Sequence, residues 1–239
     1  ELMNSRAKML GMNGTVYTDC TGVGEGNVTT AKDTALLCSE LAKYKNLTPY
    51  LTCWLDTVRD GKAELVNLNR LVRTYKGVTG MKAWGSEKAG SCIAATAEKG
   101  DMSVCVVLNG CDSQEDMNAE AKKLLNLAFD TYEIYTPELP EDMVKETVVC
   151  GGEELSVKLA PEGLYPIVIP RGTYRMVECD FTAEEKLDAP VKNGETAGEI
   201  RYTMGDEVIL DGKIVACKEV KKMNFICGIK KLVYNLLSM

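Results

Sequence analysis

Two side chains close to the start of the chain have a spacing at which a hydroxyl group can be activated as a nucleophile. Ser5 and Lys8 form the pattern Ser-x-x-Lys, and residues three apart lie on one face of a helix. An amine beside a serine hydroxyl can accept its proton, which is a first requirement of covalent catalysis. Because the pattern specifies only two positions, we favour an ordinary surface pair on a helix as its interpretation.

The other residue types that usually carry chemistry are missing or poorly spaced. The 239 residues include no histidine, which excludes Ser-His-Asp and Cys-His nucleophile pairs and two-histidine zinc sites. Ten cysteines occur, but no two have the Cys-x-x-Cys spacing of a metal knuckle. Several of them, such as Cys105, lie in apolar stretches and are expected to be small buried residues, although disulfides stay open. We expect no metal ion and no cofactor.

The composition indicates a folded protein that does not bind nucleic acid. Apolar residues make up 45% and charged residues 26%, which excludes a disordered or fibrous chain. The length suits one large domain or two smaller ones. With 28 basic against 35 acidic residues the net charge is −7, so nothing favours a phosphate backbone as partner. The first residues lack a basic and then apolar leader, so we expect a processed chain or a fragment.

Helices and a hairpin are predicted for the first half of the chain, where they would position these side chains. Apolar residues at helical spacing predict a short helix over 1–10 and a second helix that Thr29 or Thr30 caps. Two β-rich runs within 90–109, separated by good turn residues, predict an antiparallel hairpin. Ser113 is expected to cap a long amphipathic helix.

Changes in residue composition and in the spacing of apolar residues divide the chain into segments. A stretch with two prolines and three acidic residues follows the long helix and suits an exposed connection. Beyond it, short apolar runs alternate with turn residues such as those at 192–194, which is typical of a small all-β module. We therefore predict a mixed domain, a linker, an all-β domain and a tail, over 1–136, 137–143, 144–220 and 221–239.

The tail, residues 221–239, has an apolar stripe at helical spacing together with four lysines and no acidic residue. It is too short and too charged to span a bilayer, so a basic amphipathic helix that lies on a membrane surface is expected. The alternative is a helix that docks on a partner protein.

The stretch 77–92, GVTGMKAWGSEKAGSC, resembles the third motif of the penicillin-binding D-alanyl-D-alanine carboxypeptidases, as does its continuation IAATAE. Short supporting resemblances occur in the same order along the chain, at 2–4, 10–12, 65–71, 121–125 and 187–194. The last of them looks like the small β domain that follows the catalytic domain in this family. The basic tail looks like the membrane anchor of such proteins, so the resemblance covers nearly the whole chain.

The resemblance implies a fold and an activity. The fold is α/β plus all-β: a partial penicillin-binding or β-lactamase-like transpeptidase domain, with an antiparallel sheet and helices, then a small β-sandwich and an amphipathic C-terminal helix. The implied place is the outer face of a bacterial cytoplasmic membrane, where such enzymes trim the terminal D-alanine of peptidoglycan stem peptides. In these enzymes the serine of the Ser-x-x-Lys motif attacks the peptide carbonyl, and the lysine of the same motif acts as the base. The Ser-x-Asn motif assists proton transfer. The Lys-Thr-Gly strand helps to hold the substrate carboxylate.

The chain departs from the family pattern in three places. The Ser-x-x-Lys and Ser-x-Asn motifs lie upstream of the segment that residues 2–4 resemble, so we assign no catalytic residue. Lys82 matches the motif lysine, but Ala83 replaces the threonine and Trp84 the glycine, and we expect the indole to crowd the ligand channel. The arginine that the family directs at the substrate carboxylate falls on or beside Met117.

The candidate binding residues at the motif are therefore Lys82, Ala83, Trp84 and Ser86. Lys82 binds a ligand carboxylate or is a solvated strand lysine, and Ser86 could offer a hydroxyl nearby. For Trp84 a packing role is favoured over a platform on which a ligand stacks.

Three hypotheses remain open from the sequence. The chain is the C-terminal part of a low-molecular-weight carboxypeptidase that hydrolyses only when an N-terminal part is present, or it is a pseudoenzyme that binds the wall or a partner. The third is a product of gene fragmentation or of incorrect sequence assignment. The expected ligands are a stem peptide or a β-lactam. Apolar surface that the missing part would cover calls for a second copy or an N-terminal partner chain.

Overall fold

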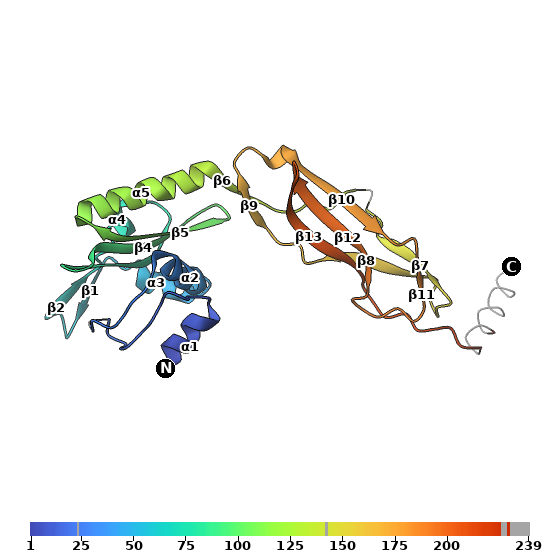
Figure 1. Cartoon of the computed structure of the whole chain (residues 1–239), viewed down its shortest axis with the longest axis horizontal. Coiled ribbons are helices and arrows are strands. Elements are labelled where there is room, and N and C mark those ends of the chain that lie inside the picture. Colours follow the sequence, from blue (N-terminus) through green and yellow to red (C-terminus); the bar gives the residue numbers. More distant parts are fainter. Residues whose placement is uncertain (23, 142, 226–228, 230–239) are drawn as a thin grey trace. The chain divides into compact units, whose positions relative to one another are not determined.

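In a computed structural model the chain forms two compact units, Glu1–Tyr132 and Glu133–Met239 (Figure 1). The structure describes all residues except 23, 142, 226–228 and 230–239. Residues 133–135 group with the second unit because strand β6, Tyr132–Tyr135, pairs with β9, Ile167–Pro170. The linker range 137–143 stays a prediction.

Three longer helices belong to the first unit and confirm the helices predicted there: α1, Leu2–Met9, α2, Ala31–Leu41, and α5, Gln114–Thr131. The backbone N–H of Asp33 donates to the Thr30 hydroxyl over 3.1 Å, so Thr30 rather than Thr29 caps α2. The N–H of Asp116 donates to Ser113 Oγ over 3.0 Å in the same way. Each cap satisfies one of the N–H groups that the first helical turn leaves without a partner.

A three-stranded antiparallel sheet with the order β3-β4-β5 lies between α5 on one face and α2 on the other (Figure 1). Its strands are β3, Val78–Ser86, β4, Gly90–Lys99, and β5, Met102–Cys111. The pair β4-β5 is the predicted hairpin. Shorter elements complete the unit: η1, Lys45–Leu47, α3, Thr48–Leu51, β1, Leu55–Val58, β2, Ala63–Val66, and α4, Leu71–Thr74.

The core of the first unit lies between α5 and the sheet. The side chains of Met117, Ala121, Leu125 and Phe129 recur every four residues and are buried on one face of the helix. Burial of each large apolar side chain contributes about 1.5–3 kcal/mol to stability. This packing fixes α5, and with it the orientation of the sheet faces.

The second unit is β-rich, as predicted. A six-stranded sheet has the order β10-β12-β13-β8-β7-β11 and shares one core with the β6-β9 pair. Tyr202 is fully buried in that core, and its hydroxyl donates to the Glu138 carbonyl over 2.9 Å. The remaining elements are β7, Glu146–Cys150, β8, Ser156–Glu162, η2, Tyr174–Met176, β10, Val177–Ala183, β11, Lys186–Asp188, β12, Thr196–Met204, and β13, Glu207–Ala216.

The predicted tail helix over 221–239 does not begin at its first residue. Lys222 forms a β-bridge with Gly152, and the Glu153 N–H donates to the Lys221 carbonyl, so these two lysines lie in extended chain. Most of the remaining tail lies outside the described residues. Within the described part of the chain, no helix has the length and apolar character needed to cross a membrane.

Candidate functional site

The strand β3 sorts the candidate binding residues onto two faces of the sheet. Side chains alternate along a strand, so Lys82, Trp84 and Ser86 share one face while Ala83 points to the other. Ala83 is 3% exposed and belongs to the core. Where the family has a threonine, this chain therefore contributes a methyl group to packing.

Lys82 and Trp84 line a cavity of about 580 Å³ on the α2 side of the sheet. The apolar part of its wall comes from β4 and β5, and the polar part comes from four amide and hydroxyl side chains, Asn27, Thr29, Thr34 and Asn109. Among the described residues, no carboxylate pairs with the Lys82 ammonium group. The cavity thus presents an unpaired cation beside hydrogen-bonding groups and an apolar floor, which suits a small molecule with a carboxylate.

A hydrogen-bond network at the N-terminus of α2 holds the polar wall in place. The Thr15 hydroxyl donates to Asp33 Oδ2 over 2.7 Å and lies 2.9 Å from the Thr29 hydroxyl. The Gly14 N–H donates to the same carboxylate oxygen over 2.8 Å. The hydrogen bond from Thr15, followed by those from Gly14 and Thr30, lowers the pKa of Asp33, which keeps the carboxylate charged and accepting. Thr29 is therefore fixed at the cavity through Thr15.

The indole of Trp84 is not a core residue. It is 48% exposed, and besides the Lys82 cavity it lines a second hollow of about 490 Å³ at the end of the strand. Its cross-strand neighbour is Cys92 on β4. The indole thus takes up space beside Lys82 and offers an accessible aromatic face there.

Ser86 has a local role in the turn between β3 and β4. Its hydroxyl accepts a hydrogen bond from the Ala89 N–H over 3.1 Å. The residue lines the second hollow together with Asp112 and Gln114, and it does not line the cavity of Lys82. The structure therefore brings Lys82 and Trp84 together and leaves Ser86 apart from the lysine.

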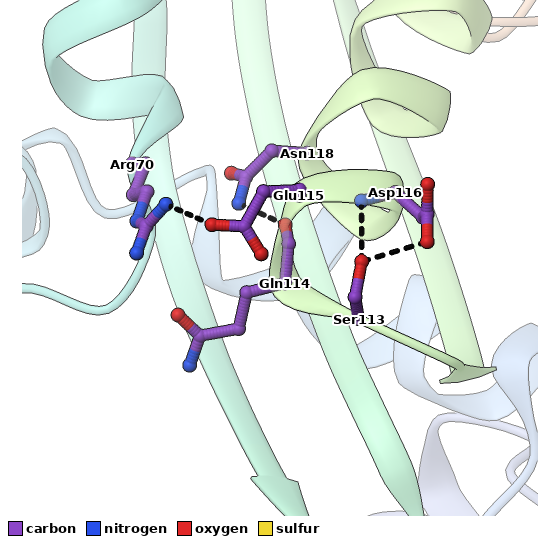
Figure 2. Close-up of polar contacts among 6 residues, drawn as sticks. All are labelled: Arg70, Ser113, Gln114, Glu115, Asp116 and Asn118. Carbon is purple, nitrogen blue, oxygen red and sulfur yellow. Dashed lines mark hydrogen bonds and ion pairs between the residues drawn. The ribbon is translucent and has the colours of Figure 1, made fainter.

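The first turn of α5 is occupied by contacts among its own neighbours. Figure 2 shows the Ser113 cap, and it shows Arg70 donating to Glu115 Oε1 over 2.7 Å. The Asn118 amide donates to the Gln114 carbonyl over 2.6 Å. Met117 is 1% exposed and packs into the core, so the position at which the resemblance implies an arginine is structural here.

Ser5 and Lys8 lie on α1, and both side chains are exposed. Arg6 docks this helix on α2 by an ion pair of 2.6 Å with Glu40. Neither Ser5 nor Lys8 lines the cavity of Lys82. The arrangement agrees with an ordinary surface pair.

Sequence reasoning missed the polar wall of the cavity. Asn27, Thr29, Thr34 and Asn109 come from the α2 region and from β5, far from Lys82 in the chain. Thr29 drew notice only as a possible cap. No spacing in the sequence signals the group, because chain folding alone brings these segments to one sheet face.

Sequence models of two protein families match the chain. The model described as D-alanyl-D-alanine carboxypeptidase matches residues 1–112, and that of the C-terminal domain of penicillin-binding protein 5 matches residues 129–222. The D-alanyl-D-alanine carboxypeptidase DacF of Bacillus subtilis is 30% identical over 234 residues, and DacC of Escherichia coli is 29% identical over 227 residues. These alignments cover 96% and 94% of this chain but only 60% and 56% of the two relatives.

Solved structures of penicillin-binding proteins share the fold of this chain. Penicillin-binding protein 5 of Haemophilus influenzae has a TM-score of 0.76 at 23% identity, with 92% of this chain and 65% of that protein covered. The cefotaxime-bound penicillin-binding protein D2 of Listeria monocytogenes has a TM-score of 0.50 at 28% identity, with 54% of this chain and 53% of that protein covered.

Proposed function

The chain belongs to the D-alanyl-D-alanine carboxypeptidases, the low-molecular-weight penicillin-binding proteins of peptidoglycan metabolism, and we propose that its Lys82 cavity binds the D-alanyl-D-alanine end of a stem peptide. Residues 1–239 by themselves bind this end without hydrolysing it. Hydrolysis of the terminal peptide bond is the reaction of the complete enzyme, to which this chain contributes the ligand-binding strand β3.

The observation that carries the proposal is the ammonium group of Lys82, which lines the cavity and has no carboxylate partner among the described residues. A peptide that ends in D-alanyl-D-alanine has a carboxylate, peptide groups and two methyl groups. Lys82 is suited to the carboxylate, the side chains of Thr29, Thr34 and Asn109 to the peptide groups, and the floor of β4 and β5 to the methyl groups.

The position of Ser5 supports the proposed absence of hydrolysis. Ser5 is the serine of the one Ser-x-x-Lys pattern in the printed sequence, and it does not line the cavity. Without an activated hydroxyl beside the ligand carbonyl, no acyl-enzyme forms. The purified chain, incubated with a fluorescent penicillin and run on a denaturing gel, should show no labelled band. A band that heat-denatured chain does not show would refute this part of the proposal.

Ligand binding is testable separately, because the chain has only two tryptophans. In a Trp54→Phe variant the fluorescence reports Trp84 alone, inside the cavity wall. An N-acylated D-alanyl-D-alanine should change this emission to a saturating value, and the L,L-dipeptide should do so more weakly. Emission that stays constant at millimolar D,D-dipeptide would contradict the binding site.

A pseudoenzyme that tethers a wall or protein partner is the second candidate. The exposed indole of Trp84, the core position of Met117 and the methyl group of Ala83 favour it, because each takes the place of a family binding group. Release of D-alanine by the product of the whole reading frame, upstream codons included, supports the enzyme. Binding without release supports the pseudoenzyme.

We also propose that the protein is exported and lies on the outer face of a bacterial cytoplasmic membrane, held by residues 221–239. The four lysines of this segment, without an acidic residue, favour anionic lipid headgroups. Deletion of residues 223–239 should abolish co-sedimentation with vesicles of phosphatidylglycerol. Sedimentation that the deletion leaves unchanged would count against anchoring.

The two edges of the three-stranded sheet support the proposal that a second copy or an N-terminal partner chain covers the first unit. In the described residues, β3 and β5 are edge strands. Leu55 and Leu65 of the nearby β1-β2 hairpin are 48% and 57% exposed. Light scattering of the purified chain should give a mass above 26.1 kDa if a second copy covers the sheet, whereas a mass of 26.1 kDa favours a separate partner chain.

A further inference from the structure

Cys38 of α2 and Cys105 of β5 face each other where the helix packs on the sheet. Cys38 is 3% exposed, and α2 contacts β5 more extensively than it contacts β4. Cys105 is half-buried. Both thiols are free, and neither is used by the site around Lys82.

The strand register places the Cys105 sulfur on the side of the sheet that α2 covers. Cys105 is the direct cross-strand partner of Thr96, so the two side chains lie on the same face. Both of them line a cavity of about 360 Å³ together with Ser39 and Ala42 of α2. Ala42 follows Cys38 by four residues and shares its helix face, so this face of α2 looks onto Cys105.

The two thiols are close enough to influence each other's protonation. The Cys105 thiol donates a hydrogen bond to the sulfur of Cys38, which lowers the pKa of Cys38. The same bond, together with burial, raises the pKa of Cys105. The pair therefore loses its first proton more readily than two isolated buried thiols would, and the remaining proton is shared between the sulfurs.

We propose that Cys38 and Cys105 form a reversible disulfide that joins α2 to β5. A disulfide such as oxidised glutathione reaches the pair at the 360 Å³ cavity, whose wall includes Cys105. The singly deprotonated pair attacks it through the Cys105 sulfur while the remaining proton moves to Cys38, and the glutathione thiolate that leaves then takes this proton from Cys38. The Cys38 thiolate then displaces the second glutathione, so that two protein thiols and one glutathione disulfide become one protein disulfide and two glutathione thiols.

The crosslink bears on the Lys82 cavity through α2. Thr34 precedes Cys38 by one helical turn, on the same helix face, and lines the wall of that cavity. A covalent bond at Cys38 therefore holds this wall at a fixed distance from the sheet. The chemistry of the cysteine pair does not depend on the ligand proposed for Lys82.

A peptide map of the oxidised chain tests the disulfide without any substitution. The folded chain is equilibrated with oxidised glutathione, alkylated and digested with trypsin under non-reducing conditions. The peptides 33–43 and 100–122 should be recovered as one linked species that separates on reduction. Recovery of both Cys38 and Cys105 in alkylated form, or linkage of either to another cysteine, would overturn the proposal.

Two matched variants on β5 show which of its cysteines forms the bond, and they control for effects of the substitution on folding. Peptide 100–122 contains Cys111 as well as Cys105, so Cys111→Ser should keep the link and Cys105→Ser should abolish it. Oxidation should raise the melting temperature of the wild type and of Cys111→Ser by roughly 5–10 °C, because the bond closes a long loop. An equal rise in Cys105→Ser would show that another bond is responsible.

Discussion

Substitution of Lys82 by methionine removes the cation of the cavity and keeps most of its volume. In the structure this ammonium group has no ion-pair partner among the described residues, so the variant leaves no protein carboxylate unpaired and the fold should persist. A hydrogen bond to a charged group contributes about 1.5–3 kcal/mol. Because the Lys82 side chain is exposed to solvent, we expect the lower part of that range, roughly 1.5–2 kcal/mol. At tenfold per 1.4 kcal/mol, the Kd for the D,D-dipeptide should rise roughly 10–30-fold.

The measurement is a titration of Trp84 fluorescence in the Trp54→Phe background. Lys88→Met is the matched control, because Lys88 follows the same strand and its side chain is 82% exposed beside Glu25. The control should change the Kd by less than about threefold, in line with the small energy of exposed ion pairs. Equal Kd values for Lys82→Met and the parent chain would refute the assignment of the carboxylate to Lys82.

Three further variants test the scaffold of the site. The pKa of Asp33 is lowered in the fold, so the charged carboxylate stabilises the fold at pH values above its unfolded-state pKa of about 4. This stabilisation is lost as the pH falls through the folded-state pKa. The urea midpoint of Asp33→Asn should therefore depend less on pH in acid than that of the parent chain. Met117→Ala should cost about 2–5 kcal/mol in urea unfolding against less than about 0.5 for Met9→Ala, which is 75% exposed; similar costs would contradict the core position. Tyr202→Phe should lower the stability of the second unit by about 1–1.5 kcal/mol and Tyr165→Phe by almost nothing, as calorimetry can establish.

The regular elements were predictable where their signals are local. Ser113 and the apolar stripe ending at Phe129 define α5 within one stretch of chain, since a cap and a helical period need only near neighbours. The hairpin of β4 and β5 was predictable from two apolar runs and the turn between them. The start of the tail was not, because the pairing of Lys222 with Gly152 depends on a segment far away in the chain.

The candidate site was predictable only in part. The resemblance at residues 77–92 singled out Lys82 and Trp84, and the structure brings both into one cavity. It also singled out Ser86, whose hydroxyl accepts from a turn N–H instead. A packing role was favoured for Trp84, yet its indole is half exposed, because the burial of a strand residue depends on what packs against its face of the sheet.

The amino-acid order alone determined the family, the mixed and β-rich halves, and the lack of histidine chemistry, because these depend on residue types and short-range spacing. Tertiary structure decided which side chains meet: Thr29 and Thr34 with Lys82, and Cys38 with Cys105. The physical reason is that a strand turns alternate residues to opposite faces, and only the packing of α2 on one of these faces selects their neighbours.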